Sequence, residues 1–137
     1  MEILYPMFGM IALSGIIATF LLASRMPVII KMWGNLQHAK HADVMRPHLP
    51  TRMRYITDNY NHIFEQPTLF YAVVVYLFLM QHTDETHIIL AWVFVCLRAV
   101  HSVIQLSNNN VTWRATCFAA STCCLIIMIA REAALFI

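Results

Sequence analysis

The sequence predicts an all-α protein whose four helices cross a membrane as a bundle. Of its 137 residues, 60% are hydrophobic and 12% are charged, whereas an average soluble domain is about 45–50% apolar and about 25% charged. The apolar residues gather in four stretches that approach the roughly 20 residues a membrane helix needs. The length suits one domain, and a net charge of +2 is too small to indicate nucleic-acid binding.

The first span is predicted over residues 3–24, which contain no charged side chain. A run of this length can cross a hydrocarbon core of about 30 Å. Glu2 stands where a signal peptide would carry positive residues, and the apolar run is longer than a signal peptide needs. We therefore interpret the segment as a permanent span.

The polar segment 25–58 is predicted to be a loop on the cytoplasmic side. It contains six of the nine Lys and Arg residues, and loops rich in Lys and Arg stay on the cytoplasmic side of a membrane. Four spans then place both termini outside. We expect an integral, multi-pass membrane protein.

The second span, residues 59–81, begins with two polar turns that include Asn61, His62 and Glu65. Such turns cannot face lipid, so they should face protein or a wet cavity. Pro67 is expected to kink this helix because proline leaves a backbone carbonyl without its partner.

The third and fourth spans are predicted over residues 87–107 and 111–131. The asparagine triplet Asn108–Asn110 between them indicates a turn. Three polar residues interrupt the inner part of the third span: Arg98, His101 and Gln105.

The ionisable residues of the spans are expected to meet in one leaflet. Glu65 and His101 each lie about six residues from the cytoplasmic end of their helix, or roughly 9 Å deep, and Arg98 lies about 13 Å deep. Arg25 and Arg114 sit at the same membrane face. The spacing puts His62 and Glu65 on one stripe of the second span, and Arg98, His101 and Gln105 on one stripe of the third. Glu65 could therefore pair with Arg98 or Arg114.

Two interpretations of this cluster are open. It could be a buried ion pair that fixes the register of the helices, but one Glu–Arg pair would suffice for that. Because cations outnumber carboxylates here, we favour a cationic pocket for a small ligand that carries carboxylates and an ammonium group. An ionisable cluster inside a membrane indicates a functional site by default.

The cysteines and loop histidines give weaker signals. Four cysteines within the spans match no zinc spacing and are interpreted as buried packing thiols. The loop histidines could bind a metal, but a solvated basic loop is favoured, and no metal site is predicted. These residues are Cys96, Cys117, Cys123, Cys124, His38, His41 and His48.

Three motifs, in order along the chain, carry a family resemblance. The stretch Asn-His-Ile-Phe-Glu-Gln-Pro at residues 61–67, followed by Leu-Phe-Tyr at 69–71, resembles the second-helix motif of the MAPEG superfamily, the membrane-associated proteins in eicosanoid and glutathione metabolism. Arg98-Ala-Val-His-Ser resembles its third-helix motif, and Arg114 its fourth-helix arginine. Arg25-Met-Pro is similar to bacterial members, which the chain resembles more than the microsomal enzymes.

The resemblance implies a homotrimer of four-helix bundles that binds glutathione between neighbouring subunits, in the cytoplasmic half of the membrane. It implies that Glu65 binds the ammonium group of glutathione and that Arg25 binds a carboxylate. Arg114, the implied catalytic residue, would lie beside the sulfur. An adjacent guanidinium lowers the pKa of a thiol from its usual value near 8.5 without losing its own proton. The other implied binding residues are Asn61, His62, Arg98, His101 and Gln105.

The favoured function is that of a glutathione-dependent transferase or peroxidase acting on lipophilic electrophiles that enter from the bilayer. The expected partners are further copies of the chain, membrane lipids and the lipophilic substrate. A trimeric scaffold without catalysis is the alternative, and a lipid, quinone or metal site in the same pocket is a third. Departures from the family pattern argue against prostaglandin-type isomerisation: His62, Gln105, Ala115 and Phe118.

Overall fold

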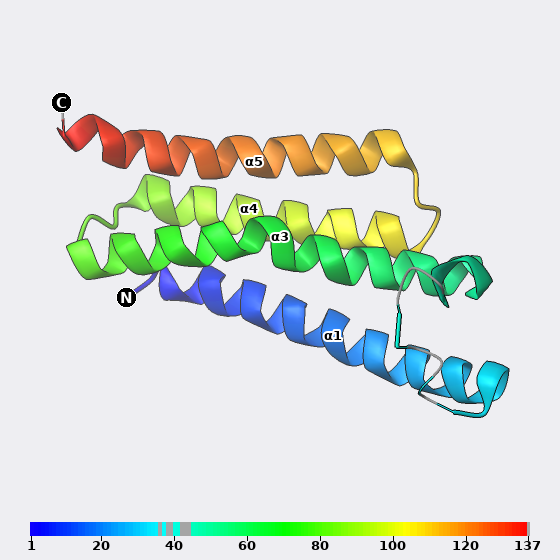
Figure 1. Ribbon diagram of the computed structural model, residues 1–137. Helices are drawn as coiled ribbons and strands as arrows, with labels where there is room; N and C mark the ends of the chain where they lie inside the picture. The colour runs from blue at the N-terminus through cyan, green and yellow to red at the C-terminus, as the bar shows by residue number, and fades with distance from the viewer. Residues whose placement is uncertain (36, 38–39, 42–44, 137) are drawn as a thin grey trace.

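The computed structural model describes residues 1–35, 37, 40–41 and 45–136. Within these ranges the chain forms four long α-helices, two short 3-10 helices and no strand. Figure 1 shows the long helices running up and down beside one another, with both termini and the α3–α4 turn at one end. The elements are α1 (Leu4–Trp33), η2 (Arg46–His48), α3 (Thr51–Met80), α4 (Glu85–Leu106), α5 (Val111–Ala133) and η3 (Ala134–Phe136).

All four long helices are long and apolar enough to cross a membrane, as the sequence predicts. Their outer surfaces expose many large apolar side chains, including Phe8, Leu22, Leu79 and Ile126. A bundle with such a surface suits a lipid environment, where apolar side chains lie outside as well as inside.

Helices α1 and α3 are longer than the predicted spans. Each has 30 residues, about 45 Å at 1.5 Å per residue, so both extend well beyond a hydrocarbon core of about 30 Å. Helix α1 continues through Pro27, beyond which Ile29 packs in a second apolar cluster with Met53 of α3. It ends at Gly34, whose left-handed conformation (φ 66°) lets its N–H donate to the carbonyl of Ile30.

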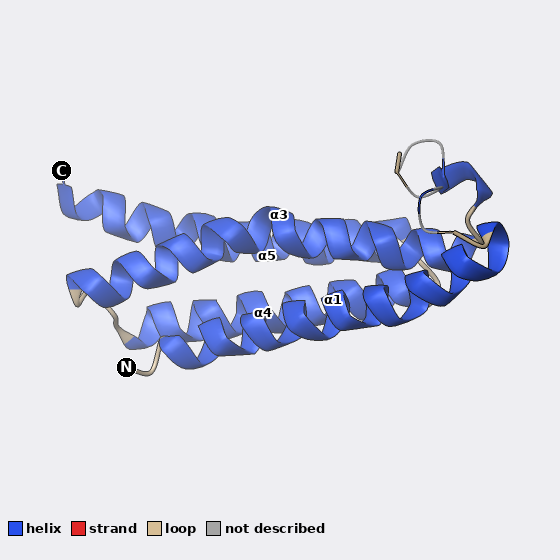
Figure 2. Ribbon diagram, turned by 60° about the horizontal axis from the view of Figure 1, so that its bottom comes forward, coloured by secondary structure: helices blue, strands red, loops and turns tan. Residues whose placement is uncertain are grey.

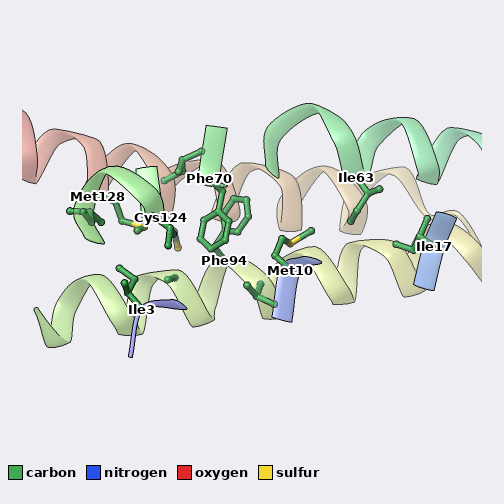
Figure 3. Packing of buried hydrophobic residues seen from close by; sticks show 13 residues of the cluster. Ile3, Met10, Ile17, Ile63, Phe70, Phe94, Cys124 and Met128 are labelled. Atoms are coloured by element: carbon green, nitrogen blue, oxygen red, sulfur yellow. The ribbon is translucent and has the colours of Figure 1, made fainter. Parts of the chain in front are cut away.

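The main core draws on all four long helices, and its aromatic pair lies where α3 and α4 face each other. The rings of Phe70 and Phe94 stack with their centroids 4.4 Å apart and their planes 7° from parallel. Figure 3 shows this pair in the middle of the cluster, with Met10 from α1 and Cys124 and Met128 from α5 nearby. The stacked pair fixes how α3 and α4 lie along each other, and thereby which polar residues meet further along.

An ionic cluster that was not predicted joins the α3–α4 turn to the end of α5. Asp84 caps α4 by accepting a hydrogen bond from the backbone N–H of His87 (2.8 Å), and it pairs with Arg131 of α5. His82 donates from Nδ1 to Oε2 of Glu132 (2.7 Å), and the buried His87 lies 3.8 Å from the same carboxylate. The end of the bundle that holds the two termini is therefore tied by charge.

Asp84 should make stability depend on acid. The backbone N–H of His87, followed by the charges of His87 and Arg131, lowers the pKa of Asp84 below its ordinary value of 3.8. The native state then binds this proton less tightly than the unfolded chain, so its contribution is present above about pH 4 and is lost as pH falls through the native pKa. Asp84→Asn keeps the cap but loses the charge. We expect it to lose stability more gently than wild type below pH 4.

The check is the thermal transition in mild detergent between pH 3 and pH 7. At neutral pH, Asp84→Asn should lower the free energy of unfolding by less than about 1 kcal/mol, because Asp84 and Arg131 are both partly exposed. Glu85→Gln, one residue further on, is the matched control. An acid profile of Asp84→Asn identical to wild type would show that the Asp84 charge does not act on folding.

Topology can be tested by labelling single cysteines in a background without the four native ones. His48 and Glu85 are exposed at opposite ends of α3. Because α3 crosses the membrane once between them, His48→Cys and Glu85→Cys should react with an impermeant maleimide from opposite sides. Reaction of both from the same side would rule out α3 as a span.

Candidate functional site

Four of the predicted site residues meet in one pocket near the end of the bundle away from the termini. The pocket has a volume of about 270 Å³ and is lined by His62 and Glu65 of α3, His101 of α4 and Arg114 of α5. His62 and Glu65 share a helical face because they are three residues apart. Arg114 reaches the pocket from the first turn of α5, directly after the asparagine turn. Figure 2 shows the long helices in two rows, with α3 and α5 in one row and α1 and α4 in the other.

Glu65 does not make either of the pairings that the sequence predicts. Its side chain is 59% exposed, and its contact is with Nδ1 of His62 at 3.2 Å. Successive residues of a helix point about 100° apart, and it is Gln66 that faces α4 and meets Arg98. Glu65 is thereby left at the mouth of the pocket.

Arg98 lies below the pocket and is fully buried. It donates hydrogen bonds to Oε1 of Gln66 (3.4 Å) and to the backbone carbonyl of His62, and its guanidinium lies 5.7 Å from the ring centre of Phe118. Within the described residues no carboxylate lies within 4.0 Å of it. A buried charge held only by neutral oxygens favours a negative charge nearby.

Gln66 is the residue whose role the sequence analysis missed. Its Oε1 accepts from Arg98 of α4 and from Oγ of Ser121 of α5 (3.0 Å), and its Nε2 donates to Thr122. One side chain thus joins three helices. The available signal was its position, as an amide in a polar helical turn directly before Pro67.

Arg114 and His101 occupy the opposite wall. Arg114 donates from Nη1 to Oδ1 of Asn109 (2.5 Å), and Asn109 has a left-handed backbone (φ 50°) that asparagine tolerates well. His101 is nearly buried, with its ring 6.0 Å from that of His62 and 6.5 Å from that of Phe118. The turn therefore positions the arginine as well as joining two helices.

Three other predicted residues lie outside this pocket in the single chain. Arg25 lines a separate hollow of about 450 Å³ beside α1, which Tyr60 of α3 closes. Asn61 is exposed on α3. Gln105 is fully buried, and within the described part of the chain its amide has no hydrogen-bond partner.

The remaining polar signals do not add a site. Among the described residues, no three His, Cys, Asp or Glu side chains are arranged to hold a metal ion; His38 lies outside these residues. The interpretation of the cysteines as buried thiols is right for Cys117 and Cys124 and wrong for Cys96 and Cys123, which are exposed on the outer surface of the bundle.

The comparisons with known proteins agree with the helices and the motifs. The model of the MAPEG family matches residues 3–134, which include all four long helices and every residue that lines the pocket. No curated protein and no solved structure matches. With four membrane-length helices and a family match over nearly its whole length, this chain is an integral, multi-pass membrane protein of the MAPEG family.

Proposed function

We propose that this protein is a glutathione-dependent membrane enzyme, a transferase or peroxidase that acts on lipophilic electrophiles. The observation that carries the proposal is the charge of the pocket. Arg114 lines the pocket, and Arg98 is buried behind its lining residues His62 and Phe118. One carboxylate, Glu65, stands against these two guanidinium groups. A low-dielectric site with surplus positive charge favours an anionic ligand, and glutathione has two carboxylates, one ammonium group and a thiol.

The groups of the pocket suit the parts of this ligand. Glu65 is exposed at the mouth, where its bond among the described residues is to His62, and it can accept from the ammonium group. Arg114 projects its planar guanidinium from α5 and would lie beside the sulfur, where it stabilises the thiolate over the thiol. With an aryl halide arriving from the bilayer, the thiolate forms a carbon–sulfur bond as the carbon–halogen bond breaks and halide departs. With a hydroperoxide, the thiolate takes the terminal oxygen as the O–O bond breaks and an alcohol departs, and a second glutathione converts the sulfenic acid to the disulfide and water.

The proposal includes assembly as a homotrimer with the site shared between subunits. The pocket of about 270 Å³ is slightly smaller than the roughly 300–1,000 Å³ of typical ligand sites. Arg25 lines a different hollow of the same chain. Both observations suit a site that a neighbouring Arg25 completes with a cation for a glutathione carboxylate.

The orientation follows from charge. The six basic residues between 25 and 58 lie toward the end of the bundle that holds the pocket, and the positive-inside rule puts that end in the cytoplasm. We therefore propose an inner-membrane protein with both termini outside and the site in the cytoplasmic leaflet.

A trimeric scaffold without catalysis is the second candidate. The observation in its favour is that Ala115 and Phe118 line the pocket, so the adjacent wall of α5 offers no hydroxyl group to a reacting substrate. Binding of a lipid or quinone in the same pocket remains the third.

Arg114 separates the enzyme from the scaffold. Removing a donor that stabilises developing negative charge costs about 10²–10³ in rate, and a lysine cannot reproduce the planar fork. Arg114→Lys and Arg114→Ala should therefore slow conjugation of glutathione to a lipophilic aryl halide by about that factor. The loss should shrink at high pH, where the thiol ionises unaided.

The measurement uses purified protein in mild detergent, whose mass is determined first to establish the subunit number. Arg131→Lys makes the same exchange at the far end of α5 and should keep full activity. No turnover by wild type with any aryl halide, enone or hydroperoxide would favour the scaffold. Turnover that Arg114→Ala matches at neutral pH would remove the role of Arg114 alone.

Glu65 should govern affinity and leave folding almost unchanged. Because the Glu65 side chain is exposed, Glu65→Gln should change the free energy of unfolding by less than about 1 kcal/mol. A hydrogen bond to a charged group contributes about 1.5–3 kcal/mol, so glutathione affinity should fall roughly 10- to 100-fold. Calorimetric titration measures this, with Glu85→Gln as the control. Equal affinity in wild type and Glu65→Gln would mean that the ammonium group binds elsewhere.

A further inference from the structure

A groove between α1 and α3 lies apart from the candidate site, at the end of the bundle that carries most of the basic residues. It encloses about 390 Å³. Its walls are apolar, with Phe20 and Val28 from α1 and Met53 and Ile56 from α3. Among the described residues, Arg52 is its one charged lining residue. It shares no lining residue with the pocket of the candidate site.

The depth of the groove is unusual for an apolar surface. Counted from Leu4 and Met80 at the far end, 20 residues cover the roughly 30 Å of hydrocarbon and end near residue 23 of α1 and residue 61 of α3. Ile56 then lies about 7 Å, and Arg52 about 13 Å, beyond the hydrocarbon. The headgroup layer adds about 5–7 Å on each side, so Val28 and Ile56 stand at its outer edge, where contact with water is unfavourable, and Arg52 lies about one helical turn further out.

The polar groups at the groove leave a positive charge available. The hydroxyl of Ser24 already donates to the backbone carbonyl of Phe20 (2.6 Å), so it has no proton to offer a ligand. Arg52 is exposed and lies in the first turn of α3, whose dipole adds positive potential. Among the described residues near this end, the carboxylate of Asp58 is paired with Arg46 (2.8 Å).

We propose that this groove binds one anionic phospholipid. An acyl chain covers the walls formed by Phe20, Val28, Met53 and Ile56, and the phosphate group lies against Arg52. A free phosphate ion would satisfy the arginine but leave the apolar walls wet. A zwitterionic lipid would bring its own cation to a basic end of the molecule. Of these three ligands, the anionic phospholipid matches both the walls and the charge.

Native mass spectrometry of the purified full-length protein tests the proposal. Phosphatidylglycerol and phosphatidylcholine with identical acyl chains are titrated separately, and bound lipid is counted. One basic residue near a membrane surface favours an anionic lipid by about fivefold, so wild type should retain phosphatidylglycerol at least that much better. Arg52→Gln should abolish the preference, whereas Lys31→Gln, an equal loss of charge on an exposed turn outside the groove, should keep most of it.

The walls are tested with a second pair of variants. Val28→Trp should fill the groove and reduce binding of both lipids, and Met32→Trp, one turn further along α1 and outside the groove, should not. If Val28→Trp fails to fold, the exposed Arg52 still decides the matter. The proposal is overturned by equal retention of both lipids, by an Arg52→Gln result equal to that of Lys31→Gln, by displacement of the lipid with inorganic phosphate, or by a second copy of the chain in place of the lipid.

Discussion

The burial of the Arg98 guanidinium is the constraint on which the rest of the site depends. A charge inside a membrane bundle is costly unless polar groups surround it, and here the amide of Gln66 and a backbone carbonyl of α3 supply them. The same amide accepts from Ser121. The three helices that carry the pocket are therefore held together by one cation and one amide, and the floor of the pocket is positive because no carboxylate within the described chain neutralises it.

Helical phase and depth predicted the meeting of half of the candidate site residues. His62 and Glu65 share a stripe of α3 at the depth of His101, and Arg114 lies at the same membrane face, so these four line one pocket. The partner of Glu65 was not predictable in the same way, since a rotation of one residue exchanges its direction with that of Gln66. The three motifs predicted the family, and the match of the family model over residues 3–134 confirms that prediction. Binding of glutathione and trimer formation stay proposals.

The features that sequence reasoning missed share a physical cause. The charged cluster at the terminal end combines a helix cap, a turn and the last turn of α5. Its members are distant in sequence, since 47 residues separate Asp84 from Arg131. Each piece has an ordinary local explanation, and only the packing of the helices brings them together. Likewise, Pro27 and the polar residues around it indicated a loop, but tertiary contacts of Ile29 and Met53 extend the helices.

Helix α5 is held at two levels along its length. Asp84 and His82 hold Arg131 and Glu132, and about 15 Å further along the axis Gln66 holds Ser121 and Thr122. Seventeen residues separate Arg131 from Arg114, about 26 Å along the axis. Arg114 thus lies about 10 Å beyond the nearer of these ties, so its position rests on its own turn, where Asn109 accepts its hydrogen bond. A change in the asparagine turn would therefore move the cation of the pocket without disturbing the ties along the rest of α5.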